Sequence, residues 1–285
     1  MNASPLRSRI SFAARIILGG ALLYAGVVKA LQPAAMSYLR HIHSRAHATM
    51  APSQEVIDML QREGIQHTHL LGRGVDTQLF NPARRNVLLR RSWGAGEHDI
   101  VAMYVGRLAA EKNLPVVIQT YQTMRIVRPN TKLVFVGDGP ELPRLQREFP
   151  QGIFAGMRVR EQLAEHYASA DVFLFPSTTE TYGNVTVEAM ASGLAVIAYD
   201  YAAARQHIRH SINGLKAPFD ATDEFIKLAI GLAPHTARIR ALGAAARVTT
   251  EKLDWSCIVT EFEQALLGLI DAQPLHSLAT ADAFA

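Results

Sequence analysis

Four short, almost uninterrupted apolar runs lie between residues 99 and 199, and they constrain the fold of this chain more than any other feature. Each run has the length of a strand. An apolar run without polar alternation is typical of a strand that is buried on both faces. The four runs are Asp99–Val105, Lys132–Val136, Asp171–Phe175 and Leu194–Tyr199.

Helical patterns separate these runs and continue after them. Regular alternation of buried strands with helices predicts βαβ units, and therefore an α/β fold with a doubly wound parallel sheet. Ligands bind such sheets at the carboxyl ends of the strands, so the loops that follow the strands should carry the chemistry. The expected helices are Pro115–Arg128, Glu141–Glu148, Arg160–Ala170, Asn184–Ala191, Ala221–Leu232, Thr236–Thr249 and Trp255–Ile270.

The composition is that of a globular protein, with 49% hydrophobic and 19% charged residues, which excludes wholesale disorder. Cys257 is the only cysteine, so no internal disulfide can form. The net charge of +4 is uneven, because residues 1–100 hold 12 Lys and Arg against 6 Asp and Glu. A basic excess suits an anionic membrane surface, a phosphorylated ligand, nucleic acid or a solvated face. Nucleic acid is disfavoured, because zinc-finger spacing, aromatic ribonucleoprotein motifs and heptad-linked basic helices are missing from the sequence.

The first forty residues contain a mostly apolar stretch, Ser11–Leu31, which is interrupted by Arg15 and Lys29. Its uncharged part, Ile16–Val28, has 13 residues, whereas a spanning helix needs about 20. The two flanking cations could extend it by reaching the membrane interfaces. Three interpretations stay open: a membrane anchor or interfacial helix, a buried helix of a soluble fold, and a cleaved signal peptide.

The loop after the first apolar run holds Gly106, Arg107 and Lys112. Glycine lets the backbone come close to a ligand, and Arg and Lys are the side chains that bind phosphate. An ordinary basic loop, with the cations paired to Glu111, is the alternative. The loop after the second run begins with Gly137 and Asp138 and is either a turn near a nucleotide or only a turn.

The loop after the third run leads through Glu180 and Gly183 into a helix that begins at Asn184 and carries Glu188. The N-terminus of a helix presents unpaired N–H groups and a positive dipole end, which together bind anions. Each carboxylate can accept several hydrogen bonds and therefore suits sugar hydroxyls. Alternatively, Glu180 is a solvated loop acid and Glu188 a surface carboxylate near the helix dipole.

These motifs together resemble the nucleotide-sugar-binding domain of the retaining, family-four glycosyltransferases of GT-B fold. The motif sequences are most similar to those of the branch that includes GDP-mannose-dependent α-mannosyltransferases and sulfoquinovosyl lipid synthases. The resemblance covers roughly residues 38–269 and implies a Rossmann-like domain. The matching stretches are Gly72–Pro82, Tyr104–Leu114, Phe135–Leu145, His166–Val196 and Gly214–Pro218.

The resemblance implies catalytic roles for three side chains at the strand ends. Arg107 and Lys112 match the basic pair that grips the donor diphosphate, and Glu180 matches the acid that holds hydroxyls of the transferred sugar. Two fixed cations and a helix N-terminus would stabilise the negative charge that builds on the departing nucleoside diphosphate.

The other matching residues are expected to bind the donor. Backbone N–H groups of the turn before the helix would bind the distal phosphate, and Glu188 would bind the ribose hydroxyls. The segment Met157–Val159 would lie beside the base. Tyr182 stands where the family often has Phe. The predicted donor-binding residues are Gly106, Gly137, Asp138, Gly183, Asn184, Val185 and Glu188.

The family's mechanism implies retention of configuration, with the donor diphosphate itself helping to deprotonate the acceptor. Neither a cofactor nor a metal is expected, because the chain lacks an Asp-x-Asp pair that would hold a metal-bound diphosphate. The expected partners are a GDP- or UDP-sugar donor, a lipid or glycan acceptor and an anionic membrane surface, with no nucleic acid. The expected location is the cytoplasm, at the inner face of the membrane.

The resemblance also gives a domain plan: residues 1–37 as an apolar N-terminal helix and candidate membrane anchor, 38–71 as a remnant of the acceptor-side domain, 72–272 as the nucleotide-sugar-binding domain and 273–285 as a flexible tail. A short, mainly helical region would thus precede the Rossmann-like sheet. Because the acceptor-side domain is incomplete, two functions stay open. One is a hexosyltransferase, and the other is a non-catalytic nucleotide-sugar-binding remnant.

Overall fold

The computed structural model describes residues 41–43, 46–180 and 182–271, which form parts of two compact units. One unit is Val75–Asp254, and the other combines Met1–Gly74 with Trp255–Ala285. The apolar stretch Ser11–Leu31, the segment 1–37 and the tail 273–285 lie outside the described residues. Within the described part, none of the helices is long and apolar enough to cross a membrane.

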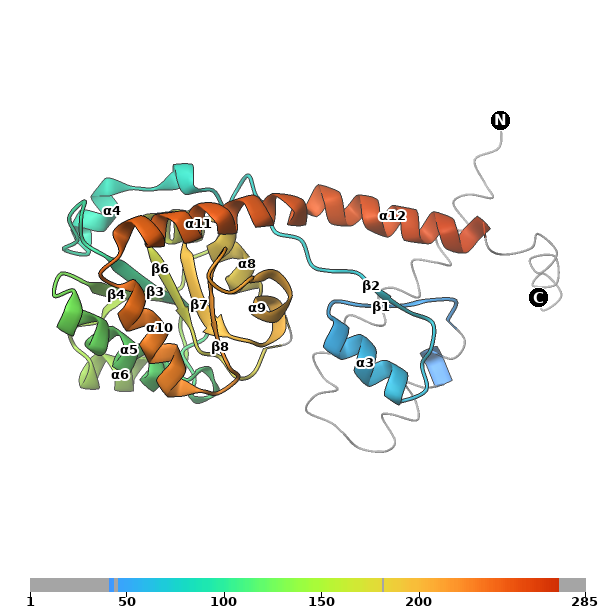
Figure 1. Ribbon diagram of the computed structural model, residues 1–285, viewed down its shortest axis with the longest axis horizontal. Coiled ribbons are helices and arrows are strands. Elements are labelled where there is room, and N and C mark those ends of the chain that lie inside the picture. Colours follow the sequence, from blue (N-terminus) through green and yellow to red (C-terminus); the bar gives the residue numbers. More distant parts are fainter. Residues whose placement is uncertain (1–40, 44–45, 181, 272–285) are drawn as a thin grey trace. The chain divides into compact units, whose positions relative to one another are not determined.

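The unit Val75–Asp254 is built on a parallel sheet of six strands in the order β5-β4-β3-β6-β7-β8 (Figure 1). All four predicted strands are confirmed. The two strands that the sequence did not predict lie at the edges of the sheet. The strands are β3 (Val101–Val105), β4 (Lys132–Val136), β5 (Ile153–Gly156), β6 (Val172–Phe175), β7 (Ala195–Tyr199) and β8 (Leu215–Ala217).

Helices cover both faces of this sheet, because right-handed crossovers that run in opposite directions along a sheet place their helices on opposite faces. Helix α5 packs on α10, whereas α8 packs on α7 and α11. The bounds of the predicted helices are confirmed to within one residue. The helical elements are η1 (Pro82–Arg84), α4 (Val87–Ser92), η2 (Ala110–Lys112), α5 (Leu114–Val127), α6 (Leu142–Glu148), α7 (Arg160–Ser169), α8 (Asn184–Ala191), α9 (Ala202–His207), α10 (Thr222–Leu232), α11 (Thr236–Thr250) and η3 (Glu251–Leu253).

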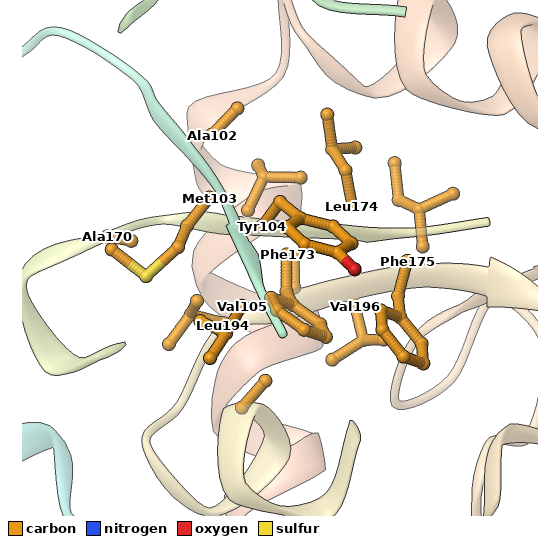
Figure 2. Packing of buried hydrophobic residues seen from close by; sticks show 14 of the residues in the cluster. Ala102, Met103, Tyr104, Val105, Ala170, Phe173, Leu174, Phe175, Leu194 and Val196 are labelled. Atoms are coloured by element: carbon orange, nitrogen blue, oxygen red, sulfur yellow. The ribbon is translucent and has the colours of Figure 1, made fainter. Parts of the chain in front are cut away.

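The core of this unit lies around the two central strands, β3 and β6, whose side chains are almost fully buried. Phe173 and Phe175 of β6 stack with 5.5 Å between their ring centroids. Tyr104 of β3 stacks on Phe175 at 6.0 Å, and Figure 2 shows its ring, with the hydroxyl oxygen, among the apolar side chains of both strands. The sheet is therefore closely packed along its two central strands, which support the loops that follow them.

The other unit is described by itself. Strand β1 (Thr49–Ala51) pairs in parallel with β2 (Thr68–Leu70), and helix α3 (Gln54–Arg62) connects them. Ser53 caps α3 by accepting from the backbone N–H of Val56. A small apolar cluster joins these elements: Ala51, Val56, Ile57, Leu60 and Ile65. Helix α12 (Trp255–Asp271) also belongs to this unit and confirms the last predicted helix.

Candidate functional site

The candidate site lies where the strand order of the large sheet reverses. The chain runs from β3 outward to β4 and β5 and then returns to β6, which pairs with β3 on its other side. Ligands bind α/β sheets outside the carboxyl ends of the strands at such a switch point. The loops after β3 and β6 carry Arg107, Lys112 and Glu180, so the fold brings the three predicted catalytic residues to one edge.

Two glycines allow the loops after β3 and β4 to lie against each other. Gly137 has a φ of +136°, and a Cβ added there would lie 2.0 Å from the carbonyl oxygen of Gly106. The carbonyl oxygen of Asp138 accepts from the N–H of Leu108 at 2.9 Å, and its carboxylate accepts from the N–H of Gly139 at 2.7 Å. This geometry explains Gly137 and Asp138 as a turn. Their contact with a nucleotide stays a prediction.

Arg107 is held by its backbone and leaves its side chain in solvent. The Tyr104 hydroxyl donates to the carbonyl oxygen of Arg107 at 3.1 Å. Burial raises the pKa of Tyr104 well above its ordinary value, and the charges of Glu180 and Glu111 add to this effect. Within the described ranges, the exposed Arg107 guanidinium makes neither a hydrogen bond nor an ion pair. The pairing with Glu111 that was the alternative for this cation is therefore not what the structure contains.

Lys112 instead forms a compact polar group with the loop after β6. Its Nζ lies 2.6 Å from Oε1 of Glu180, and each side chain is 16% exposed. Lys112 also donates to the carbonyl oxygen of Thr179 at 2.9 Å. The Ser177 hydroxyl donates to the same Glu180 oxygen at 2.6 Å. A diphosphate that reaches Lys112 must therefore compete with Glu180.

The N-terminus of α8 is open to an anion. Its N-cap, Gly183, has a φ of +89°, and the helix start has no side-chain cap. A Cβ on Gly183 would meet no atom closer than 3.7 Å, so glycine is needed here for its left-handed backbone rather than for space. The uncapped N–H groups of Asn184 and Val185 can bind an anion, as helix N-termini commonly do.

Glu188 sits one turn farther along α8 and is held by a tyrosine that the sequence reasoning missed. The hydroxyl of Tyr167, from α7, donates to Oε2 of Glu188 at 3.1 Å. Burial raises the pKa of Glu188, and the hydrogen bond from Tyr167 partly offsets that rise. The single proton of this hydroxyl is shared with the carbonyl oxygen of Val185, which lies 3.4 Å away. Tyr167 thus links the acid to the first turn of α8.

Two other supporting residues were also missed. Ser177 stands three residues before Glu180, and Tyr201 follows β7 at the same edge of the sheet. The Tyr201 hydroxyl donates to the carbonyl oxygen of Glu180 at 3.0 Å. Reading every strand end for hydroxyl groups, and not only for charges and glycines, would have identified both.

The remaining predictions concern the base and a metal. Met157 and Val159 follow β5 with 66% and 61% exposure, and their contact with a base stays a prediction. Among the residues that the structure describes, no three His, Cys, Asp or Glu side chains gather in a way that could hold a metal ion. The expectation that no metal takes part is not tested by this finding.

The chain is similar in sequence to known glycosyltransferases. Residues 99–233 match the family described as glycosyl transferases group 1. A GDP-mannose-dependent alpha-mannosyltransferase of Mycobacterium tuberculosis is 38% identical over 239 residues, which cover 84% of this chain and 60% of the relative. The sulfoquinovosyl transferase SQD2 of Arabidopsis thaliana is 34% identical over 236 residues, or 79% of this chain and 45% of the relative. The chain spans about three fifths of the length of the mannosyltransferases it matches.

Solved structures show the same fold. The chain superposes on Anabaena Alr3699/HepE in complex with UDP and glucose with a TM-score of 0.70 and 20% identity, over 84% of this chain and 68% of that one. Sucrose-phosphate synthase from Thermosynechococcus elongatus gives a TM-score of 0.72 and 22% identity, over 89% and 66%. The expected Rossmann-like α/β fold is thereby confirmed.

Proposed function

Residues 99–233 of this chain belong to the family of glycosyl transferases group 1, and on this premise we propose that the chain binds a GDP- or UDP-sugar and transfers its hexose to a lipid or glycan acceptor with retention of configuration. The observation that carries the proposal is the meeting of two loops at the switch point of the sheet. There the exposed Arg107 and the Lys112–Glu180 pair share one edge with the open N-terminus of α8.

The two ends of the donor would engage this edge differently. Arg107 and the N–H groups of Asn184 and Val185 are available to a diphosphate without the loss of any existing side-chain contact. Lys112 must first leave Glu180, which then becomes free to accept hydrogen bonds from sugar hydroxyls. Phosphate binding and sugar binding are therefore coupled through this ion pair.

The catalytic gain would come from electrostatics. Departure of the nucleoside diphosphate builds negative charge, and cations and N–H dipoles that face this charge stabilise the transition state. The half-buried Glu188, held by Tyr167, would accept hydrogen bonds from the ribose hydroxyls. With these groups the protein needs no nucleophile of its own, because the acceptor attacks the sugar directly.

The choice of donor and acceptor follows the relatives. The mannosyltransferases that the chain resembles are named for GDP-mannose, and another similar protein is an alpha-monoglucosyldiacylglycerol synthase of Acholeplasma laidlawii, at 24% identity. We therefore propose GDP-mannose as the first donor to test and a lipid as the first acceptor. We also propose the cytoplasmic face of the membrane as the place of reaction, which fractionation of the chain with and without residues 1–37 would test.

The test is a titration followed by a transfer assay. Purified chain is titrated with GDP, UDP and their sugar conjugates, and radiolabelled donors are then scored for hydrolysis and for transfer to membrane lipid. Tight binding of one nucleotide sugar together with transfer supports the proposal. The absence of any nucleotide binding would overturn it.

The alternative function is nucleotide-sugar binding without catalysis. It is considered because the chain spans about three fifths of the length of its mannosyltransferase relatives. Binding without hydrolysis or transfer, lost in Glu180→Ala, would favour a non-catalytic nucleotide-sugar-binding protein.

A further inference from the structure

The loop that carries Glu180 is joined to α9 by a hydrogen-bonded pair, a buried tyrosine and a half-buried histidine. The hydroxyl of Tyr182 lies 2.8 Å from Nε2 of His207, and the two rings meet edge to face with 6.0 Å between their centroids. Tyr182 is only 1% exposed. This hydrogen bond is costly to lose, because the buried Tyr182 has little access to water that could replace His207.

Further contacts join the same two segments. The N–H of Ala203, in the first turn of α9, donates to the carbonyl oxygen of Tyr182 at 2.7 Å. The hydroxyl of Tyr201, just before α9, donates to the carbonyl oxygen of Glu180 at 3.0 Å. The backbone around Glu180 is thus fixed from one side by α9 and the residue that precedes it.

Tyr182 also packs in the hydrophobic core of this unit, beside a small space. A cavity of about 10 Å³ lies behind the loop, and its lining includes Glu180, Tyr182, Tyr199 and Tyr201. That volume is about what one water molecule needs. The loop is therefore held in two ways, by the packing of Tyr182 in the core and by the hydrogen bonds to His207, Ala203 and Tyr201.

We propose that Tyr182 and His207 are positioning residues that hold the Glu180 loop against α9, so that the Glu180 carboxylate meets the hydroxyls of the transferred sugar at a fixed place. The inference rests on the proposed function, because it assigns the sugar to Glu180. The proposal adds that the Tyr182 hydroxyl is required, because a phenylalanine of the same shape could not form the hydrogen bond with His207.

The state of the histidine fits this role. Burial lowers the pKa of His207 to about 4, so the imidazole is neutral near pH 7. A neutral ring can either accept from the hydroxyl or donate to it, depending on its tautomer. The pair therefore holds the loop without placing a further charge beside the sugar.

The first experiment compares Tyr182→Phe with Tyr199→Phe. The control also removes a buried hydroxyl beside the cavity, but the partner of Tyr199 is Thr222 of α10 and not the loop. Tyr182→Phe should lower the affinity for the nucleotide sugar about tenfold, the scale of one hydrogen bond, and leave nucleoside diphosphate affinity within about twofold. A purely structural role would lower both affinities together and would overturn the proposal.

Two further variants test the coupling. His207→Leu should reproduce the loss of sugar selectivity, and the double variant should lose no more than either single one, because both remove the same bond. In a Glu180→Gln background, Tyr182→Phe should have little additional effect on sugar affinity. Additive losses in either case would contradict the assignment.

The closing experiment needs no ligand. Amide hydrogen exchange is measured on the wild-type chain, Tyr182→Phe and Tyr199→Phe, in peptides that contain Glu180 and in peptides of β4. Exchange around Glu180 should be several-fold faster in Tyr182→Phe alone, with β4 unchanged. If the wild type binds no nucleotide but shows this pattern, the positioning pair stands and the proposed function fails; equal exchange in all three proteins overturns the pair whatever the wild type binds.

Discussion

The two edges of the large sheet use the same kinds of charged residue in opposite ways. At the amino edge, Arg90 is 2% exposed and donates to the carbonyl oxygens of Ser169, Gly96 and Asp99. It also pairs with Asp171 at 2.9 Å. All of these partners lie before or at the starts of strands, so this arginine fastens the sheet together.

The acid of this amino-edge group is equally occupied. Asp171 accepts from Arg85 at 2.7 Å, from Arg90, and from the N–H of Val101 at 2.8 Å. At the carboxyl edge, by contrast, Arg107 extends into solvent, and Glu188 has its hydrogen bond from Tyr167. The difference between the two arginines teaches that Arg90, whose donors are filled, holds the fold, whereas the exposed Arg107 at the switch point is available to a ligand.

The largest expected effect is at the amino edge. Arg90→Ala leaves Asp171 partly buried with one cation fewer and deprives three carbonyl oxygens of their donor, so the free energy of unfolding should fall by about 3–5 kcal/mol. Urea unfolding followed by circular dichroism measures this. Arg107→Ala is the matched arginine and should stay within about 0.5 kcal/mol of the wild type. Equal stability losses in the two variants would break the comparison.

The fold was largely predictable because both faces of the central strands are buried. Continuous apolar runs such as Lys132–Val136 leave few alternatives, and this run is β4 to the residue. The edge strands β5 and β8 were missed since they carry no such signal: β5 is half-buried along its length, and β8 is three residues with a central lysine.

The site was only partly predictable. The rule that ligands bind at strand ends selected Arg107, Lys112 and Glu180, and the structure places all three at one edge. The sequence could not tell that Lys112 and Glu180 contact each other, because they are 68 residues apart. The sequence also could not show that Arg90 is structural and Arg107 exposed. The two differ in how many acceptors surround the guanidinium and not in residue type.

Lowering the pH should reduce the free energy of unfolding through protonation of His207, near the carboxyl edge of the sheet. The pKa of His207 is lowered to about 4 by burial, whereas an unfolded histidine titrates near about 6.5. The unfolded state therefore binds the proton more readily, and the stability that the neutral ring allows is complete above about pH 6.5 and is lost as the pH falls toward about 4. At about 1.4 kcal/mol per pKa unit, the loss amounts to about 3 kcal/mol.

Urea unfolding of the wild type and of His207→Gln between pH 7 and pH 4 measures this loss. The free energy of the wild type should decline relative to the variant as the pH is lowered. The pKa of His166 is also lowered by burial, but this residue is present in both proteins and cancels in the difference. A constant difference across the range would mean that His207 is not protonated on unfolding in the way its burial implies.

A change at Arg107 should affect binding rather than stability. Arg107→Ala removes the charge-assisted contact that we propose to the diphosphate, so nucleoside diphosphate affinity should fall by about 1.5–3 kcal/mol. Calorimetric titration measures it, with Arg240→Ala, an exposed arginine of α11, as control. Unchanged affinity in Arg107→Ala would place the phosphate elsewhere.

The smallest expected effect comes from neutralising one acid at each edge of the sheet, Glu180 at the carboxyl edge and Asp171 at the amino edge. In Glu180→Gln the ion pair with Lys112 is lost, and the lysine becomes free for phosphate. Nucleoside diphosphate affinity should therefore rise by up to about 1 kcal/mol, the scale of a partly exposed pair, while the preference for the nucleotide sugar over the bare diphosphate disappears. Asp171→Asn is the matching change at the amino edge, and it should lower stability without changing either affinity. Competition titrations on both variants measure this, and a fall in diphosphate affinity in Glu180→Gln would mean that Glu180 orients Lys112 for the phosphate instead of competing for it.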